Sequence, residues 1–564
     1  MTNIDEYTSN RAIQEEIAAD HLDFAPAVLD DAHVGDITGA LGTISMHDRE
    51  RRRNWKHRLI TLAAIMGPGL IVMIGDNDAG GVATYTQAGQ NFGYSLLWVL
   101  LLLIPVLIIA QEMVVRLGAV TGVGHARLIY ERFGRFWGFF SVGDLFILNF
   151  LTIVTEFIGI SLGMNYFGIT PGYSVPVAAV ALVLFTISGS FRRWERVMFL
   201  CIAVSFAFVP LLFMTHPHHG ASILHGTFIP GVKGGVSGDA VLLIVAIVGT
   251  TVAPWQLFFQ QSNVIDKRIS PRWIKYERTD TIVGAFITNI AAGAYMVFAF
   301  AALGGSKFFG NFTDSGGFQD AMHSTIGYWA GGFAAIILIN AAIIGACAVT
   351  LSSSYAFGDT FHAKHSLHRK ATDAKAFYGS YAVQVAIAAA IVIIPQAPLG
   401  TMTQYVQVLA GVLLPSAILF LLLLCNDKEV LGPWCNKLWQ NALTTVIVGV
   451  LVVLSLILVI NTLFKSIDVP TLTYVLFSIL AVVLVGGGIS AFVAQNRRAA
   501  AGAHRDTLHD VRALDRDTWR MPPLDQLAPP SRTKLRMISL YTLRGYLLVA
   551  VVLITFKIVS SLVG

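Results

Sequence analysis

Long apolar stretches recur along almost the whole chain, and they limit what it can fold into. About thirteen windows are apolar enough and long enough, at roughly 20 residues each, to cross a bilayer as helices. They lie near residues 60–88, 94–118, 137–165, 174–190, 196–214, 239–260, 280–303, 328–350, 377–395, 403–425, 441–464, 472–494 and 545–563. Charged residues make up 13% of the sequence, about half of the roughly 25% found in soluble domains. The sequence therefore predicts an all-α polytopic membrane protein and argues against a soluble enzyme.

The first window is interrupted by the sequence Gly75-Asp76-Asn77-Asp78-Ala79-Gly80-Gly81. The glycines allow the backbone to leave the helix, and an ionised carboxylate at membrane depth costs several kcal/mol or more. We therefore expect a broken helix whose Asp76 and Asp78 line a cation site. A simpler interpretation is a kink in which the aspartates cap the second half-helix, and the two interpretations are compatible.

The sixth window contains Pro254 within Gly249-Thr250-Thr251-Val252-Ala253-Pro254-Trp255. Proline removes a backbone donor and obstructs the carbonyl four residues earlier, which here belongs to Thr250. That carbonyl could then bind a cation, although membrane helices also tolerate simple proline kinks. Interruptions in the first and sixth spans suggest a five-plus-five inverted repeat, in which these spans are equivalent.

Two further polar residues lie within apolar windows. Glu156 is either a functional group or a protonated, hydrogen-bonded structural one, and the sequence leaves both possibilities open. Gln407 offers one more oxygen ligand.

The cysteines Cys201, Cys347, Cys425 and Cys435 show no metal-binding spacing. We predict no resident cofactor.

Positive charge indicates orientation. Arg51, Arg52 and Arg53 precede the first span, and further basic clusters at 127–135, 192–196 and 267–278 fall on the same side of the membrane. The positive-inside rule therefore places the N-terminus in the cytoplasm of a multi-pass inner-membrane protein. The formal charge of +5 reflects this topology, and we expect the lipid bilayer as a partner and no nucleic acid. The sequence does not indicate an oligomeric state.

The predicted organisation has five parts. Residues 1–57 form an acidic cytosolic tail, 58–425 a ten-helix transport core, and 426–496 two further transmembrane helices. Residues 497–538 form a cytosolic linker, and 539–564 a last transmembrane helix that carries Lys557.

Several short motifs together resemble the NRAMP family of divalent metal transporters, over roughly residues 59 to 464. They are Gly67-Pro68, the first-span interruption, Phe92-Gly93-Tyr94, Arg116-Leu117-Gly118 with Thr121-Gly122, Glu156-Phe157-Ile158-Gly159, Thr251-Val252-Ala253-Pro254, and Gln407 eight residues before Pro415. The resemblance implies a LeuT-type fold with broken helices 1 and 6. It also implies a metal site built from Asp78, Asp76, Gly81, Thr250, Ala253 and Gln407, with Glu156, Trp255 and Gln260 in coupling or supporting roles.

The chain departs from the family pattern at positions that matter chemically. Gly81 replaces an asparagine ligand, Ala253 a methionine, Trp255 and Gln260 histidines, and Ile153 an aspartate. Without the methionine, the site lacks a soft thioether ligand, which would favour transition metals. A roomier site with only oxygen ligands suits Mg²⁺, because this ion usually keeps several of its waters. This pattern looks like the NRAMP-related magnesium transporters. Without the histidines and the aspartate, a proton relay lacks titrating groups, so uncoupled uptake is expected.

The leading hypothesis is a transporter that imports Mg²⁺, with Mn²⁺ also carried, by alternating access. One alternative is a proton-coupled importer of transition metals such as Mn²⁺ or Fe²⁺. A second is a transporter of amino acids or other organic solutes, because the LeuT-type fold serves these too.

Overall fold

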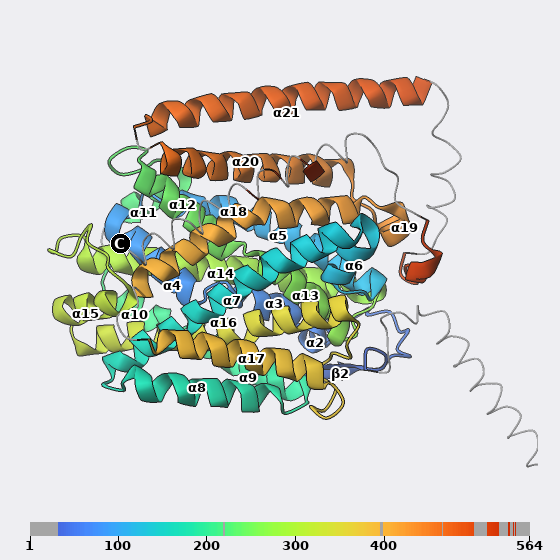
Figure 1. Ribbon diagram of the computed structural model, residues 1–564, viewed down its shortest axis with the longest axis horizontal. Helices are drawn as coiled ribbons and strands as arrows, with labels where there is room; N and C mark the ends of the chain where they lie inside the picture. Colours follow the sequence, from blue (N-terminus) through green and yellow to red (C-terminus); the bar gives the residue numbers. More distant parts are fainter. Residues whose placement is uncertain are drawn as a thin grey trace, which may run out of the picture.

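The computed structural model describes residues 32–217, 220–394, 399–464, 466–500 and 516–528, together with residues 540, 541, 545 and 548. The described chain is a bundle of helices that run mostly along one long axis (Figure 1). The helices are α2 (Trp55–Ile65), α3 (Pro68–Gly75), α4 (Ala79–Phe92), α5 (Leu97–Thr121), α6 (His125–Phe133), α7 (Arg135–Tyr166), α8 (Pro171–Thr186), α9 (Phe191–Ser205), α10 (Phe208–Met214), α11 (Gly220–Phe228), α12 (Gly238–Thr251), α13 (Pro254–Asp266), α14 (Ile274–Leu303), α15 (Ser315–Thr325), α16 (Tyr328–Phe361), α17 (Lys375–Val392), α18 (Leu399–Cys425), α19 (Lys428–Leu431), α20 (Leu438–Leu463) and α21 (Val469–Ala500). Short 3-10 turns, η1 (Pro271–Trp273), η2 (Gly432–Trp434) and η3 (Leu524–Gln526), complete the helical elements.

Ten helical segments of the described residues are long and apolar enough to cross a membrane. They correspond to ten of the windows predicted from the sequence. The first window corresponds to the bent pair α2 and α3 followed by α4, and the fourth to the shorter apolar helix α8. The predicted span 545–563 and most of the last predicted segment, 539–564, lie outside the described residues. The expectation of a polytopic helical protein is confirmed.

The first span is broken twice. The predicted break lies between the end of α3 at Gly75 and the start of α4 at Ala79. A second break, which the sequence reasoning missed, separates α2 from α3 with a bend of 55°. Gly67 has a φ of +150° there, a conformation open to glycine, and Pro68 occupies the first helical position, where its missing N–H is harmless.

The sixth span is broken where Pro254 predicts it. Helix α12 ends at Thr251, two residues leave the helix, and α13 begins at Pro254. The halves of the two broken spans pack against one another, α4 beside α12 and α3 beside α13. Four helix ends therefore meet inside the bundle.

The end of the predicted tail 1–57 is folded. Strands β1 (Ile37–Gly39) and β2 (Gly42–Ile44) form an antiparallel hairpin in which Ile37 faces Ile44. The hairpin packs against α2, and β1 also contacts α9. Residues 1–31 lie outside the described residues. The acidic composition of the tail gave no sign of strands, and it is tertiary contact with the bundle that stabilises the hairpin.

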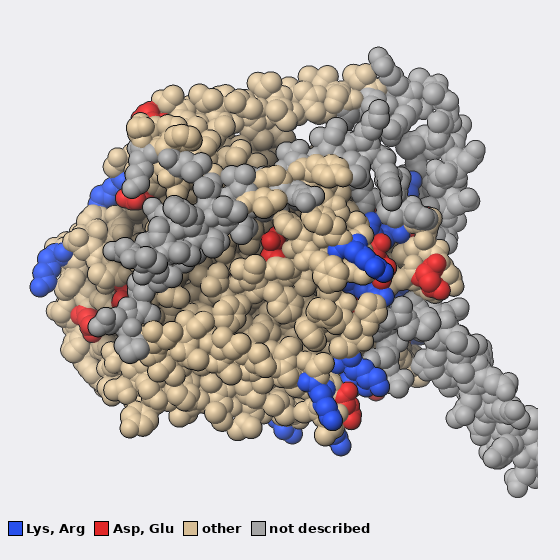
Figure 2. Space-filling model, viewed as in Figure 1, with Lys and Arg blue, Asp and Glu red and all other residues tan. Residues whose placement is uncertain are grey.

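Helices α20 and α21 correspond to the two additional spans predicted for 426–496. Helix α20 packs on α12 and α18, whereas α21 contacts α20 and forms the edge of the bundle (Figure 1). On the face shown in Figure 2, uncharged surface covers most of the molecule, and most charged residues lie toward the two ends of the long axis. Of the predicted linker 497–538, residues 516–528 are described outside α21, and the Met521 N–H donates to the Val120 carbonyl at 3.2 Å.

Candidate functional site

The two aspartates of the first-span break are buried where α3 ends and α4 begins. Asp78 caps α4, because its Oδ1 accepts the Gly81 N–H at 2.7 Å. Asp76 has no exposed surface, and neither of its carboxylate oxygens has a hydrogen-bond partner among the described residues. The cap interpretation therefore holds for Asp78, while Asp76 offers two buried acceptors to a ligand.

Glu156 of α7 reaches the same break. Its Oε2 accepts the Ala79 N–H at 3.1 Å, and its carboxyl group lies close to that of Asp78. Oε1 is buried and has no partner in the described structure. Two buried carboxylates this close repel each other when both are ionised, so Glu156 belongs to the site and a proton on either acid would relieve the repulsion.

Thr250 approaches the break from α12. Its hydroxyl oxygen is buried without a partner in the described part of the chain. A Cβ atom on Gly81 would lie 3.0 Å from this oxygen and 2.7 Å from the Asp76 carbonyl oxygen. Gly81 is therefore closely surrounded, and a side chain at this position would require these two groups to shift; a site roomier than the family pattern stays a prediction.

Gln407 of α18 lies over the first turn of α4. A Cβ atom on Gly80 would overlap its Nε2, at 1.7 Å. This Nε2 is also buried without a hydrogen-bond partner among the described residues. Glycine at position 80 thus allows the Gln407 amide to reach the break, and its role as an oxygen ligand stays a prediction.

The three positions that depart from the family pattern in the sixth span have different surroundings. Ala253 is the buried N-cap residue of α13 and offers no side-chain ligand. The Trp255 ring lies beside the end of α3, with Cη2 3.2 Å from a Cβ built on Gly75. Gln260 donates to the Thr281 hydroxyl of α14 at 2.9 Å, so it takes part in the packing of α13 on α14.

Several polar residues that the sequence reasoning did not select hold the breaks in place. The Tyr85 hydroxyl and the Thr251 hydroxyl are 2.8 Å apart, which ties α4 to α12. Gln256 accepts from Gln111 at 2.9 Å and donates to the Thr251 carbonyl at 3.4 Å. Asn77 donates to the Thr288 carbonyl at 3.2 Å. Polar side chains within apolar windows were the available signal, but their partners are distant in sequence.

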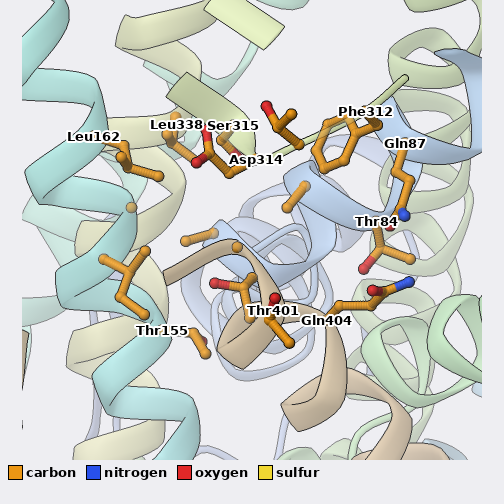
Figure 3. A pocket seen from close by; sticks show the side chains of 17 residues that line it. Thr84, Gln87, Thr155, Leu162, Phe312, Asp314, Ser315, Leu338, Thr401 and Gln404 are labelled. Carbon is orange, nitrogen blue, oxygen red and sulfur yellow. The ribbon is translucent and has the colours of Figure 1, made fainter. Parts of the chain in front are cut away.

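A cavity of about 190 Å³ adjoins the first-span break, and we call it the vestibule. Its walls come from α4, α7, α15, α16, α18 and the segment before α15 (Figure 3). Its described lining residues are Ala79, Ala83, Thr84, Gln87, Thr155, Ile158, Gly159, Leu162, Phe312, Thr313, Asp314, Ser315, Leu338, Gly400, Thr401, Thr403 and Gln404. Ala79, between Asp78 and Gly80, connects the vestibule to the buried acids.

The opposite side of the break is closed by a buried polar network near the β-hairpin. Lys267 donates to Glu195 Oε1 at 2.5 Å and to the Met66 carbonyl at 2.7 Å. Asp280 Oδ2 accepts three backbone N–H groups, from Gly67, Gly69 and Leu70, at 3.0, 2.8 and 3.2 Å. The Ala40 N–H of the hairpin also donates to Glu195. We call this end of the molecule the hairpin side. The network fixes the bend between α2 and α3.

Comparison with known proteins agrees with this architecture. The family model "Natural resistance-associated macrophage protein-like" matches residues 69–461. The divalent metal cation transporters MntH of Staphylococcus aureus strains JH9 and Newman are each 27% identical over 418 residues, covering 71% of this chain and 91% of theirs. The crystal structure of the Eremococcus coleocola manganese transporter with an aromatic bis-isothiourea compound matches with a TM-score of 0.57 and 19% identity, covering 80% of this chain and 99% of the other. This likeness shows the shared LeuT-type fold, and the family match shows that the chain belongs to the Nramp family.

Proposed function

We propose that this protein carries divalent metal cations across a membrane, Mg²⁺ first and Mn²⁺ as well, through a site at the break between α3 and α4. The observation that carries the proposal is the buried Asp76 carboxylate, which lies near Asp78 and has no hydrogen-bond partner among the described residues. An unpaired buried carboxylate is costly unless a cation or a proton compensates it. The relatives' names, divalent metal cation transporter and manganese transporter, support the class.

The chemistry of the donors supports a hard, hydrated ion. The ligands that we propose are carboxylate oxygens of Asp76 and Asp78, the Thr250 carbonyl and the Gln407 side chain, bound directly or through water. Among the described residues, no group of three or more His, Cys, Asp or Glu side chains is arranged to hold a metal by itself. Mg²⁺ suits such an incomplete cage, because it keeps several waters and needs few protein ligands. Ala253 removes the soft ligand that would favour a transition metal.

The driving force for import would be the membrane potential. A divalent ion that enters an inside-negative compartment gains about 2.3 kcal/mol per charge for each 100 mV. Trp255, Ile153 and Gln260 have no group that titrates near neutral pH, which supports uncoupled transport. The N-terminus and the hairpin side would face the cytoplasm, so the closed network at Lys267 and the vestibule correspond to a conformation accessible from outside.

A proton-coupled importer of Mn²⁺ or Fe²⁺ is the second candidate, and one observation favours it. Glu156 lies close to Asp78, so a metal ion that binds Asp78 could displace a proton from this pair of acids. Transport of an organic solute with a carboxylate group is disfavoured, because three acidic side chains at the break would repel it.

The test is ion influx into proteoliposomes that contain the purified protein, with an inside-negative potential and a lumenal pH dye. We expect Mg²⁺ influx without acidification. Asp78→Asn should abolish it while retaining the cap, because asparagine also accepts at an N-cap. Asp468→Asn, at an exposed N-cap of α21, is the matched control and should transport normally. Undiminished influx in Asp78→Asn would refute the site, and Mn²⁺ influx accompanied by protons without Mg²⁺ influx would favour the second candidate.

A further inference from the structure

We propose that the vestibule contains an outer site that holds a divalent cation with its water shell, with Asp314 supplying the charge and Gln87, Thr401 and Gln404 contacting the waters. This inference rests on the proposed function, since the ion would wait there before it enters the buried site. It assigns a binding role to a segment outside the candidate membrane spans, the residues just before α15.

The vestibule leads to the buried acids. Ala79 lines it, and the N–H of this same residue donates to Glu156 at 3.1 Å. The next residue toward α3 is Asp78. An ion in the vestibule is therefore separated from the carboxylates by one short segment of backbone, at the start of α4.

The charge of the vestibule is negative. Asp314 is the one ionisable side chain among its described lining residues, and the other polar side chains are amides and hydroxyls. Figure 3 shows Asp314 on one side of the cavity and Thr401 and Gln404 on the opposite side, with Gln87 next to Phe312 and above Thr84. A cation at the centre would thus meet one full negative charge and several oxygen atoms from different helices.

The position of Asp314 is fixed by its neighbours. Its Oδ1 accepts the Gly317 N–H at 2.8 Å and so caps α15. On the other side, a Cβ on Gly400 of α18 would lie 2.9 Å from the Asp314 Cβ. One carboxylate oxygen is thereby used for the cap, and the other stays available to water in the vestibule.

The size and the donors favour a hydrated ion over a bare one. The cavity measures about 190 Å³, well above the roughly 10–15 Å³ that one water needs, so an ion can enter it together with bound waters. A single carboxylate cannot replace the water shell of Mg²⁺, which dehydrates reluctantly. The amide and hydroxyl groups can accept hydrogen bonds from metal-bound waters or donate to Asp314. Because the ion keeps its waters, the site would attract it without binding it tightly.

Asp314→Asn tests this role apart from capping, because asparagine caps a helix as well as aspartate does. In the proteoliposome assay at low ionic strength, we expect the KM for Mg²⁺ and Mn²⁺ to rise about three- to tenfold, as loss of one nearby charge predicts, with the maximal rate unchanged. The rise should shrink as salt increases. Asp320→Asn, an exposed position on the same helix, is the control and should leave KM unchanged.

Direct binding separates this inference from the proposed function. Electron paramagnetic resonance of added Mn²⁺ should show a weak site that Asp314→Asn removes and Asp78→Asn retains. If the wild-type protein transports neither ion but shows this weak site, the proposed function fails and the outer site stands. An unchanged KM and Mn²⁺ spectrum in Asp314→Asn, or an equal effect of Asp320→Asn, would overturn the outer site.

Discussion

Gly345 of α16 lies directly against the Glu156 carboxylate. A Cβ atom built on Gly345 would be 2.5 Å from Glu156 Oε2 and 2.9 Å from the Asp78 Cβ. Neither side chain can easily move away from such a Cβ atom. Glu156 Oε2 accepts the Ala79 N–H, and Asp78 accepts the Gly81 N–H. The absence of a side chain at position 345 is therefore what allows the two acids to meet.

Gly345→Ala should reduce transport at least about tenfold, equivalent to about 1.4 kcal/mol, because the added methyl group displaces Glu156 or Asp78. Gly332→Ala on the same helix is the control, since its Cβ would lie no closer than 3.8 Å to any neighbour. Initial rates of Mg²⁺ influx, at matched amounts of reconstituted protein, provide the measurement. Equal rates in the two variants would mean that the acids tolerate the displacement.

Ala253→Met should move the ion preference toward Mn²⁺, by about tenfold in the ratio of kcat/KM values or about 1.4 kcal/mol, because a thioether is a soft ligand. Ala253→Leu provides a side chain of similar volume without sulfur. Competition between Mg²⁺ and Mn²⁺ during influx measures the preference. If the leucine variant shifts as far as the methionine variant, size and not sulfur determines selectivity.

Lys267→Met should destabilise the protein by about 3–5 kcal/mol, as expected when one partner of a buried ion pair is removed. The loss leaves Glu195 unpaired, and it also removes the positive charge near Glu277 and Asp280. The double variant Lys267→Met with Glu195→Gln should be less destabilised than Lys267→Met alone. Melting temperatures in detergent compare them, and a simple addition of the two single effects would show that the pair is not coupled.

His125, at the start of α6, should make stability depend on pH. Burial lowers the pKa of His125 to about 4, although the Nδ1 contact with Gln261 Oε1 at 2.9 Å partly opposes this. The unfolded chain therefore binds the proton first, near pH 6.5. Stability should be constant above that pH, fall by about 3 kcal/mol between about pH 6.5 and 4, and level off below.

The variant His125→Asn keeps an amide donor toward Gln261 but does not titrate. Its melting temperature in detergent should lose this component of the acid-dependent decline, while the rest of the pH profile remains. If both proteins decline in parallel between pH 6.5 and 4, His125 does not carry the effect.

The sequence by itself determined the features that depend on local chemistry. Apolar windows predicted the spans because a bilayer-crossing helix must be apolar along its length. The run from Gly75 to Gly81 and Pro254 predicted the breaks because glycine and proline act on the backbone where they stand. Polar residues inside those windows pointed to Asp76, Asp78, Glu156 and Gln407.

Only the tertiary structure decided which of these groups meet and what surrounds them. Glu156 bonds to a backbone amide 77 positions away, and Gln407 lies on Gly80 through the packing of α18 on α4. Thr250 and the Asp76 carbonyl lie close to Gly81, and the β-hairpin is held by distant Glu195. Such contacts follow from how helices pack, and packing depends on the shapes of surfaces that are far apart in the chain.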